Sequence, residues 1–274
     1  MPLHTGEPLP IEHRTVESAA GLVELVTEIR RGLTDSRPLW YRGHQCSAFT
    51  LTPSLYRENP EFDDAIQRER RLITRFRQRS LPFWPAGYPQ TDWEHLFAMQ
   101  HNGVPTRLLD WSENLFVALY FALHPTHTHQ PENPEAPCHP VVWCLDPVGW
   151  NRAVLREYAE EVAILTTGDP ELEKYRPELE TRLLARPQTG VAIYGTHNSQ
   201  RIVAQRGTFT IAGKNVQPME TICNALSNET LLWRIEICGD KPSVTFDLST
   251  IGVTESMVYP DLPGLALELR SQEW

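Results

Sequence analysis

Residues 100–111, with the sequence QHNGVPTRLLDW, hold the densest group of side chains that could do chemistry. Gln100 and His101 stand at the expected end of a helix, and Arg107 and Asp110 precede the next apolar run. An arginine beside a helix N-terminus suits the binding of a phosphate or a carboxylate. The structural alternative is an Arg107–Asp110 ion pair that only fixes the turn, and the sequence leaves both interpretations open.

A second candidate group follows the strand predicted at residues 39–41. Arg42 could hold an anion there, and Gly43 would let a ligand approach the backbone closely because it has no side chain. The alternative is that Arg42 braces a loop through Asp110 or Glu94. Both interpretations again remain open.

His101 is the strongest candidate for a general base in these segments, because histidine titrates near neutral pH. No serine or cysteine in a nucleophile context accompanies it, which argues against a hydrolase triad. Later in the chain, Asn198 and Arg201 could complete a polar pocket or could satisfy a buried turn.

Helices and strands must position these groups. Apolar residues at helical spacing predict helices at residues 16–32, 61–79, 115–121, 148–159 and 171–184. A capping box at Thr91 and Glu94 predicts a further helix that ends at Asn102 and Gly103. Short apolar runs predict strands at residues 39–41, 141–145, 191–194, 201–204, 208–211 and 231–237. Helices come first and strands later, which predicts an α+β fold in a single domain, with a helix-rich N-terminal half packed on a mixed or antiparallel sheet.

Composition excludes several classes of protein. The chain has 25 basic and 35 acidic side chains, a net charge of −10, which argues against a generic nucleic-acid coat protein. Its longest apolar run, residues 115–123, is too short to span a bilayer, and the N-terminus lacks the pattern of a secretory signal. The five cysteines are odd in number and scattered, so we expect no disulfide framework and a cytoplasmic location.

Two charged or metal-like patterns have simpler explanations. Six arginines lie between residues 68 and 79, but five acidic residues lie alongside them between residues 58 and 69, so we expect a solvated helix face more than a nucleic-acid or acidic-partner surface. Histidines and cysteines between residues 124 and 144 lack the paired spacing of a zinc site, so we expect no metal.

Several of these segments together resemble the FRG domain family, which is named for an aromatic-Arg-Gly motif. The motif here is Tyr41-Arg42-Gly43, and the likeness continues at residues 100–112, 118–122, 198–209, 251–253 and 259–266. One departure is Tyr259, where phenylalanine is expected. The resemblance implies an N-terminal helical extension at residues 1–38 and an FRG domain at residues 39–270.

A weaker resemblance is to ADP-ribosyltransferases, which bind NAD. It implies that Arg42 grips the phosphates or ribose and that Tyr120 stacks on nicotinamide. The family's late glutamate is replaced by Gln205, a neutral amide that cannot offset the charge of a ribosyl cation. The available carboxylates are Glu94, Asp110 and Glu255, and the sequence does not choose between them.

These inferences predict a polar pocket on an ADP-ribosyltransferase-like core. Its expected members are Arg42, Gly43, Gln100, His101, Thr106, Arg107, Asp110, Tyr120, Asn198, Arg201 and Gln205. The leading hypothesis is an ADP-ribosyltransferase-like enzyme acting on NAD or a related nucleotide, and the resemblance implies a toxin or phage-defence effector. The alternative is a non-catalytic module that binds a nucleotide or a protein partner.

Overall fold

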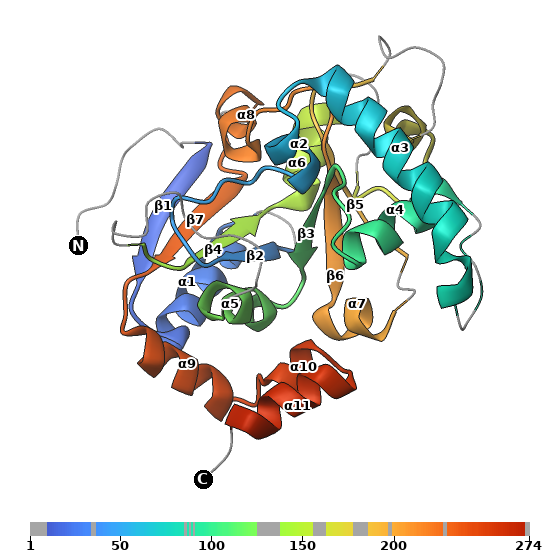
Figure 1. Cartoon of the computed structure of the whole chain (residues 1–274). Coiled ribbons are helices and arrows are strands. Elements are labelled where there is room, and N and C mark those ends of the chain that lie inside the picture. The colour runs from blue at the N-terminus through green and yellow to red at the C-terminus, as the bar shows by residue number, and fades with distance from the viewer. Residues whose placement is uncertain are drawn as a thin grey trace.

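The computed structural model describes residues 10–33, 37–84, 87, 89, 91–124, 138–155, 163–177, 186–196, 199–226 and 229–271. These residues form an α+β fold around one mixed sheet with the strand order β1-β7-β4-β2-β3-β6-β5 (Figure 1). The strands are β1 (Ile11–Val16), β2 (Trp40–His44), β3 (Leu108–Ser112), β4 (Val141–Leu145), β5 (Val191–Ile193), β6 (Gly207–Ile211) and β7 (Leu232–Ile237). Among these named strands, only β1 and β7 pair in parallel.

Helices cover both faces of the sheet. The α-helices are α1 (Ala19–Gly32), α2 (Ser54–Glu58), α3 (Phe62–Ser80), α4 (Asp92–His101), α5 (Leu115–Leu123), α6 (Pro147–Leu155), α7 (Gln200–Gln205), α8 (Met219–Leu226), α9 (Lys241–Thr250), α10 (Glu255–Val258) and α11 (Leu262–Ser271). The short 3₁₀ helices are η1 (Leu81–Phe83) and η2 (Pro170–Tyr175). In Figure 1, α10 and α11 lie at the bottom of the molecule, below α7 and to the right of α9.

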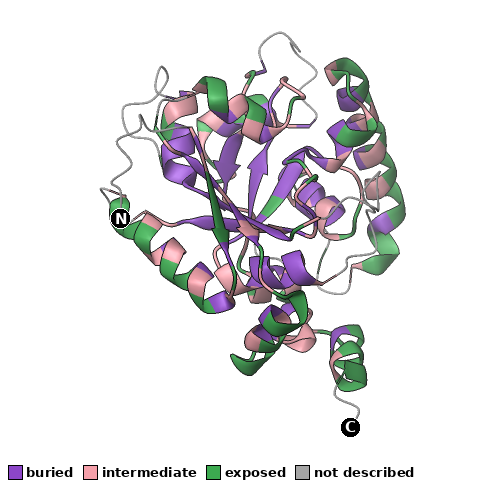
Figure 2. Cartoon of the chain, turned by 90° about the vertical axis from the view of Figure 1, so that its left-hand side faces the viewer, coloured by how far each residue is buried: buried purple, intermediate pink, exposed green. Residues whose placement is uncertain are grey.

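Strand β4 shows how the two faces are filled. Val142 and Cys144 pack into a cluster with residues of α1, α5 and α9, whereas Val141, Trp143 and Leu145 pack into a cluster with residues of α6 and α8. All five side chains are buried, and Figure 2 shows most of the strands at the centre of the molecule in the colour of buried residues. A strand buried on both faces has a continuous apolar sequence, which is why residues 141–145 are predictable.

The sheet has one weak seam, between β2 and β3. These strands share a single pair of residues, Tyr41 with Ser112. On the outer sides of the seam, β2 pairs with β4 over five residues, and β3 pairs with β6 over five residues. The sheet therefore consists of two well-paired halves, β1-β7-β4-β2 and β3-β6-β5, that separate beyond one contact.

Most of the predicted elements are confirmed with small shifts. The first helix begins at Ala19 and is capped by Ser18, because the preceding residues form β1 and pair with β7. The capping box at Thr91 and Glu94 is present, and Gly103 takes the left-handed conformation after α4. Of the predicted helices 148–159 and 171–184, the structure shows α6 and the short η2, while residues 156–162 and 178–185 lie outside the described residues.

The strand predicted at residues 201–204 is wrong, because this segment lies in helix α7. Ser199 caps the helix by accepting a hydrogen bond from the backbone of Ile202, and Arg206 ends it with a φ of 47°. Strand β3 was not expected, since Asp110 interrupts its apolar pattern on the exposed side. Helix α5 is capped by Asn114, whose side chain accepts a hydrogen bond from the backbone N–H of Phe116. The N-terminal boundary at residue 38 stays a prediction, although β1 and α1 pack into the same fold.

Cysteines 46 and 138 form a disulfide across 92 residues of sequence. This pairing corrects the expectation drawn from the scattered cysteines. It arises because β2 and β4 are antiparallel neighbours, with His44 opposite Val141, so the residues just beyond these ends lie side by side. The two cysteines are far apart in the sequence, and the pairing of β2 with β4 brings them together.

Candidate functional site

A cavity of about 290 Å³ lies at the seam between β2 and β3. Its lining comes from β2, β3 and β6 and from α2, α4, α5 and α7. The charged and titratable lining residues are Arg42, His44, Arg57, His101, Asp110 and Arg201. The aromatic lining residues are Tyr41, Phe49, Trp111, Phe121 and Phe209.

Arg42 spans the seam. Its Nη1 donates to the backbone carbonyl oxygen of Asp110 at 2.7 Å, and its Nε donates to Nε2 of His44 at 3.1 Å. The Asp110 carboxylate lies 3.9 Å from Nη1, which is an ion pair beyond hydrogen-bond distance. Burial lowers the pKa of Arg42 and the Asp110 charge opposes this effect, but an arginine remains a cation at neutral pH. The guanidinium is therefore held in one orientation at the cavity wall.

His44 is a neutral acceptor that fixes Arg42. Besides Arg42, Trp143 approaches the ring, with its indole Nε1 3.2 Å from Nδ1 of His44. Arg42 and Trp143 side chains can only donate, so a doubly protonated imidazole would oppose them. Burial, followed by the nearby Arg42 charge, lowers the pKa of His44 well below 6.5. The ring is thus neutral and receives the Arg42 hydrogen bond.

A directed chain of hydrogen bonds orients Asp110. The backbone N–H of Leu108 donates to Oγ1 of Thr106 at 3.1 Å, so the Thr106 hydroxyl is free to donate to Oε1 of Gln100. Gln100 then donates through Nε2 to Oδ2 of Asp110 at 2.5 Å. Because the Asp110 carboxylate accepts, Gln100 turns its amide nitrogen toward it and its amide oxygen toward the Thr106 hydroxyl, which sets the direction of both bonds. Thr106 is fully buried and supports the site without lining the cavity.

Helix α7 supplies the opposite wall with Arg201 and Gln205. The guanidinium carbon of Arg201 lies 4.4 Å above the centroid of the Tyr259 ring, in cation–π contact. Gln205 donates through Nε2 to the carbonyl oxygen of Val258 at 3.1 Å. The closing segment at residues 258–259 therefore holds both polar cavity residues of α7, Arg201 and Gln205, in place.

His101 lies near Arg201, and the charge of Arg201 acts on its imidazole ring. Burial lowers the pKa of His101, and the Arg201 charge lowers it further. The imidazole is thus neutral at neutral pH and able to accept a proton. Arg57, from α2, is a cavity residue that sequence reasoning missed, because nothing in the short segment around it matches a motif.

Gly43 lines the cavity and is also required for packing. A Cβ placed on Gly43 would lie 2.0 Å from the carbonyl oxygen of Ala118 and 2.6 Å from the backbone nitrogen of Ala122. Glycine is therefore required so that α5 can lie directly on β2. This close contact positions the α5 residues that line the cavity, including Phe121.

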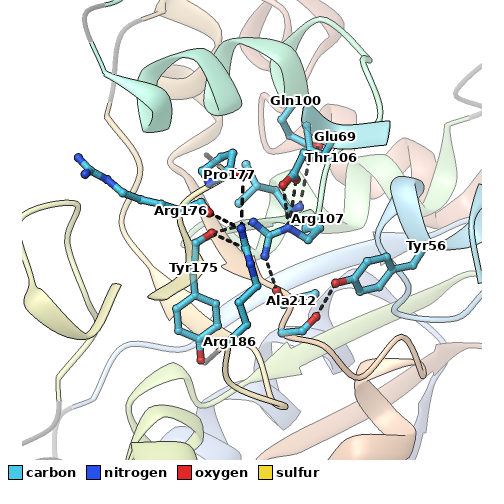
Figure 3. Close-up of polar contacts among 12 residues, drawn as sticks. Tyr56, Glu69, Gln100, Thr106, Arg107, Tyr175, Arg176, Pro177, Arg186 and Ala212 are labelled. Atoms are coloured by element: carbon cyan, nitrogen blue, oxygen red, sulfur yellow. Dashed lines mark hydrogen bonds and ion pairs between the residues drawn. The ribbon is translucent and has the colours of Figure 1, made fainter. Parts of the chain in front are cut away.

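Arg107 lies outside the cavity, in a buried polar cluster shown in Figure 3. Its Nε donates to both carboxylate oxygens of Glu69, at 2.9 and 3.1 Å. Its Nη groups donate to the carbonyl oxygens of Ala212 and Tyr175. The side chains of Arg107 and Glu69 are 1% and 0% exposed, so this pair ties α3 to the start of β3, and the alternative Arg107–Asp110 pair does not form.

The remaining predicted site residues lie elsewhere. Tyr120 is buried in α5, stacks on His124 with ring centroids 4.1 Å apart, and does not line the cavity. Glu94 is engaged in its capping box, and Glu255 lies 4.0 Å from His124. Asn198 lies outside the described residues. Asp110 is consequently the carboxylate that the described residues place at the cavity.

Among the residues that the structure describes, the other sequence patterns give no competing site, and the predicted His- and Cys-containing loop lies partly outside them, at residues 125–137. Arginines of α3 pair with acidic neighbours, Arg68 with Glu58 and Arg77 with Asp92. Across the described ranges, no three His, Cys, Asp or Glu side chains gather as a metal site would require. No helix in that part of the chain is both long and apolar enough to cross a membrane.

Comparison with known proteins identifies one family. Residues 37–131 match the model of the FRG domain. No curated protein and no solved structure matches the chain significantly. The likeness to ADP-ribosyltransferases receives no support from these comparisons and stays a prediction. The matched residues contain Arg42, Arg57, Gln100, His101 and Asp110, whereas α7 lies beyond them. The chain therefore carries an FRG domain, and this domain provides most of the charged wall of the cavity.

Proposed function

We propose that the cavity binds a phosphorylated nucleotide, with NAD as the first candidate. The observation that carries the proposal is the grouping of Arg42, Arg57 and Arg201 around a cavity to which the described residues bring one carboxylate, Asp110. Cations that converge on a partly enclosed site attract phosphate groups, and arginine binds phosphate oxygens through two donors at once. This local positive charge exists although the whole chain is acidic.

Arg42 is suited to hold the phosphate. Its Nε and Nη1 are engaged with His44 and Asp110, and within the described part of the chain its Nη2 has no hydrogen-bond partner. The orientation of the guanidinium is fixed before a ligand arrives, which lowers the entropy lost on binding.

The size and walls of the cavity suit one nucleotide unit. A volume of about 290 Å³ lies near the lower end of ligand sites, which span roughly 300–1,000 Å³. The second half of a dinucleotide such as NAD would extend beyond it. Phe49, Phe121 and Phe209 provide aromatic surface against which a base or nicotinamide could pack.

Binding is tested by isothermal titration calorimetry with NAD, ADP-ribose and nicotinamide. We expect NAD and ADP-ribose to bind, nicotinamide alone to bind much more weakly, and Arg42→Ala to lose at least about tenfold in affinity for both nucleotides. Arg71→Ala is the matched control, since Arg71 is an exposed arginine of α3 away from the cavity. Equal nucleotide affinity in the wild type and Arg42→Ala would refute the proposal.

Turnover of NAD is a second candidate, favoured by the place of Asp110 in the cavity. NAD would supply an ADP-ribosyl group when the bond between nicotinamide and ribose breaks and nicotinamide leaves with the bonding electrons. Asp110 would then offset the positive charge on the ribose, and neutral His101 could take the proton of water or another acceptor. Incubation with NAD, followed by chromatography of nicotinamide and ADP-ribose, tests this step. Asp110→Asn is expected to abolish any release.

A non-catalytic nucleotide-binding module is the alternative. Gln205 favours it, because its amide is engaged by Val258 and carries no charge. NAD binding that depends on Arg42, without release of nicotinamide in the presence of candidate acceptor proteins, would support the module. A cytoplasmic location, a protein partner and a role in toxicity or phage defence remain predictions from the sequence.

A further inference from the structure

Asp110 offers the cavity one oriented hydrogen-bond acceptor. Gln100 donates to its Oδ2, and the other end of the Gln100 amide is held by the Thr106 hydroxyl, which in turn accepts from the backbone N–H of Leu108. The side chain is nevertheless 56% exposed, so the carboxylate keeps accepting capacity on the open side. A carboxylate accepts hydrogen bonds and cannot donate them when ionised.

The carboxylate of Asp110 is not needed to hold Arg42 in place. Arg42 makes its hydrogen bond to the backbone carbonyl of Asp110, which any residue at position 110 would provide. The carboxylate itself stands 3.9 Å away from Nη1. The chain from Leu108 to Gln100 therefore orients a group that the arginine does not need for its own position.

We infer that Asp110 binds the ribose hydroxyls of the nucleotide and makes the site selective for ADP-type ligands that carry a free 2′-hydroxyl. The inference rests on the proposed nucleotide binding. Phosphate oxygens would be repelled by the Asp110 charge and drawn to the arginines, whereas a hydroxyl donates to a carboxylate. A ribose with its attached phosphates presents both groups within a few ångströms of each other, as Arg42 and Asp110 do. ADP is the part that NAD and ADP-ribose share, and one such unit suits the size of the cavity.

The test is a thermodynamic cycle by isothermal titration calorimetry with ADP and 2′-deoxy-ADP. We expect the wild type to bind ADP about tenfold or more tightly than 2′-deoxy-ADP, the loss that follows when a hydrogen bond to a charged group is removed. In Asp110→Ala, the two ligands should bind within about twofold of each other. Asp64→Asn is the control, because Asp64 is an exposed acid of α3 and should leave the discrimination unchanged.

The variants also separate loss of folding from loss of recognition. Because Asp110 is more than half exposed, Asp110→Ala should keep the circular dichroism spectrum and the thermal midpoint near those of the wild type. Asp110→Asn retains an acceptor without the charge and should give an intermediate ratio of affinities.

Each outcome separates this inference from the proposed function. Equal affinity of the wild type for ADP and 2′-deoxy-ADP, or discrimination that persists in Asp110→Ala, overturns the role of Asp110 while leaving nucleotide binding intact. Binding of NAD without binding of ADP likewise overturns the inference alone. If NAD, ADP-ribose and ADP all fail to bind, the proposed function itself is overturned.

Discussion

The Nη1 of Arg42 donates to the backbone carbonyl oxygen of Asp110 at 2.7 Å, and this bond joins two strands whose ladder has already ended. A side chain thus replaces backbone pairing at the seam of the sheet. The strands remain in register, while the space between them stays open as the cavity. Arg42, the arginine of the Tyr41-Arg42-Gly43 motif, therefore both joins the two strands and supplies positive charge to the site.

Arg42→Lys should weaken binding of NAD by about tenfold without changing the fold. A lysine ammonium is a single point donor and cannot bond His44, the Asp110 carbonyl and a ligand in the geometry of a planar guanidinium. Calorimetric titration measures the affinity, and the thermal midpoint reports on the fold. Arg71→Lys provides the matched exposed control. Unchanged affinity in Arg42→Lys would mean that charge alone is needed.

The stability of the protein should fall as the pH drops below about 6.5, with His44 as a main cause. Burial and the Arg42 charge lower its pKa in the folded state, so below pH 6.5 the unfolded chain takes up a proton that the folded chain does not. The contribution is complete above the unfolded pKa and is lost toward the lowered folded pKa, at up to about 1.4 kcal/mol per pH unit. Urea unfolding between pH 7.5 and 5 measures it. His44→Gln should show a shallower pH dependence, and an identical slope would contradict the assignment.

Glu69→Gln should destabilise the protein by about 3–5 kcal/mol, because it leaves the Arg107 cation buried without its counter-charge. The matched control is Glu58→Gln, which breaks the partly exposed pair with Arg68 and should cost less than about 1 kcal/mol. Urea unfolding at neutral pH gives both values. An equal loss of unfolding free energy in the two variants would show that the buried Glu69–Arg107 pair stabilises the protein no more than the partly exposed pair does.

Gly43→Ala should destabilise the protein by about 1–3 kcal/mol or more, since the added Cβ would overlap the backbone of α5 at Ala118. Gly32→Ala is the control, because a Cβ there meets nothing within 4 Å at the end of α1. Thermal unfolding should show a large decrease for the first variant and little change, or a small gain, for the second. Comparable midpoints would contradict the close packing of α5 on β2.

Local features of the sequence were enough to predict much of the secondary structure. Two examples are the capping box at Thr91 and Glu94 and the apolar run at residues 141–145. Both act through residues that are close in the sequence, so they can be recognised without knowledge of the fold. Residues 201–204 show the limit, because their short apolar pattern suits a strand, while capping by Ser199 and contacts to the closing segment make them helical. Strand β3 exists because β6 pairs with it along its whole length, a partner about 100 residues away.

The sequence by itself determined which residue types could form a charged site: Arg42, Gln100, His101, Asp110 and Arg201 are cavity residues that motif reasoning had singled out. Only the tertiary structure decided how they are used. It moved Arg107 into a buried pair with Glu69, kept Tyr120, Glu94 and Glu255 away from the cavity, and packed Gly43 directly against α5 at the cavity wall. The physical reason is that a motif records the chemistry available along the chain, whereas a side chain's role depends on partners brought from distant segments and on the water they exclude.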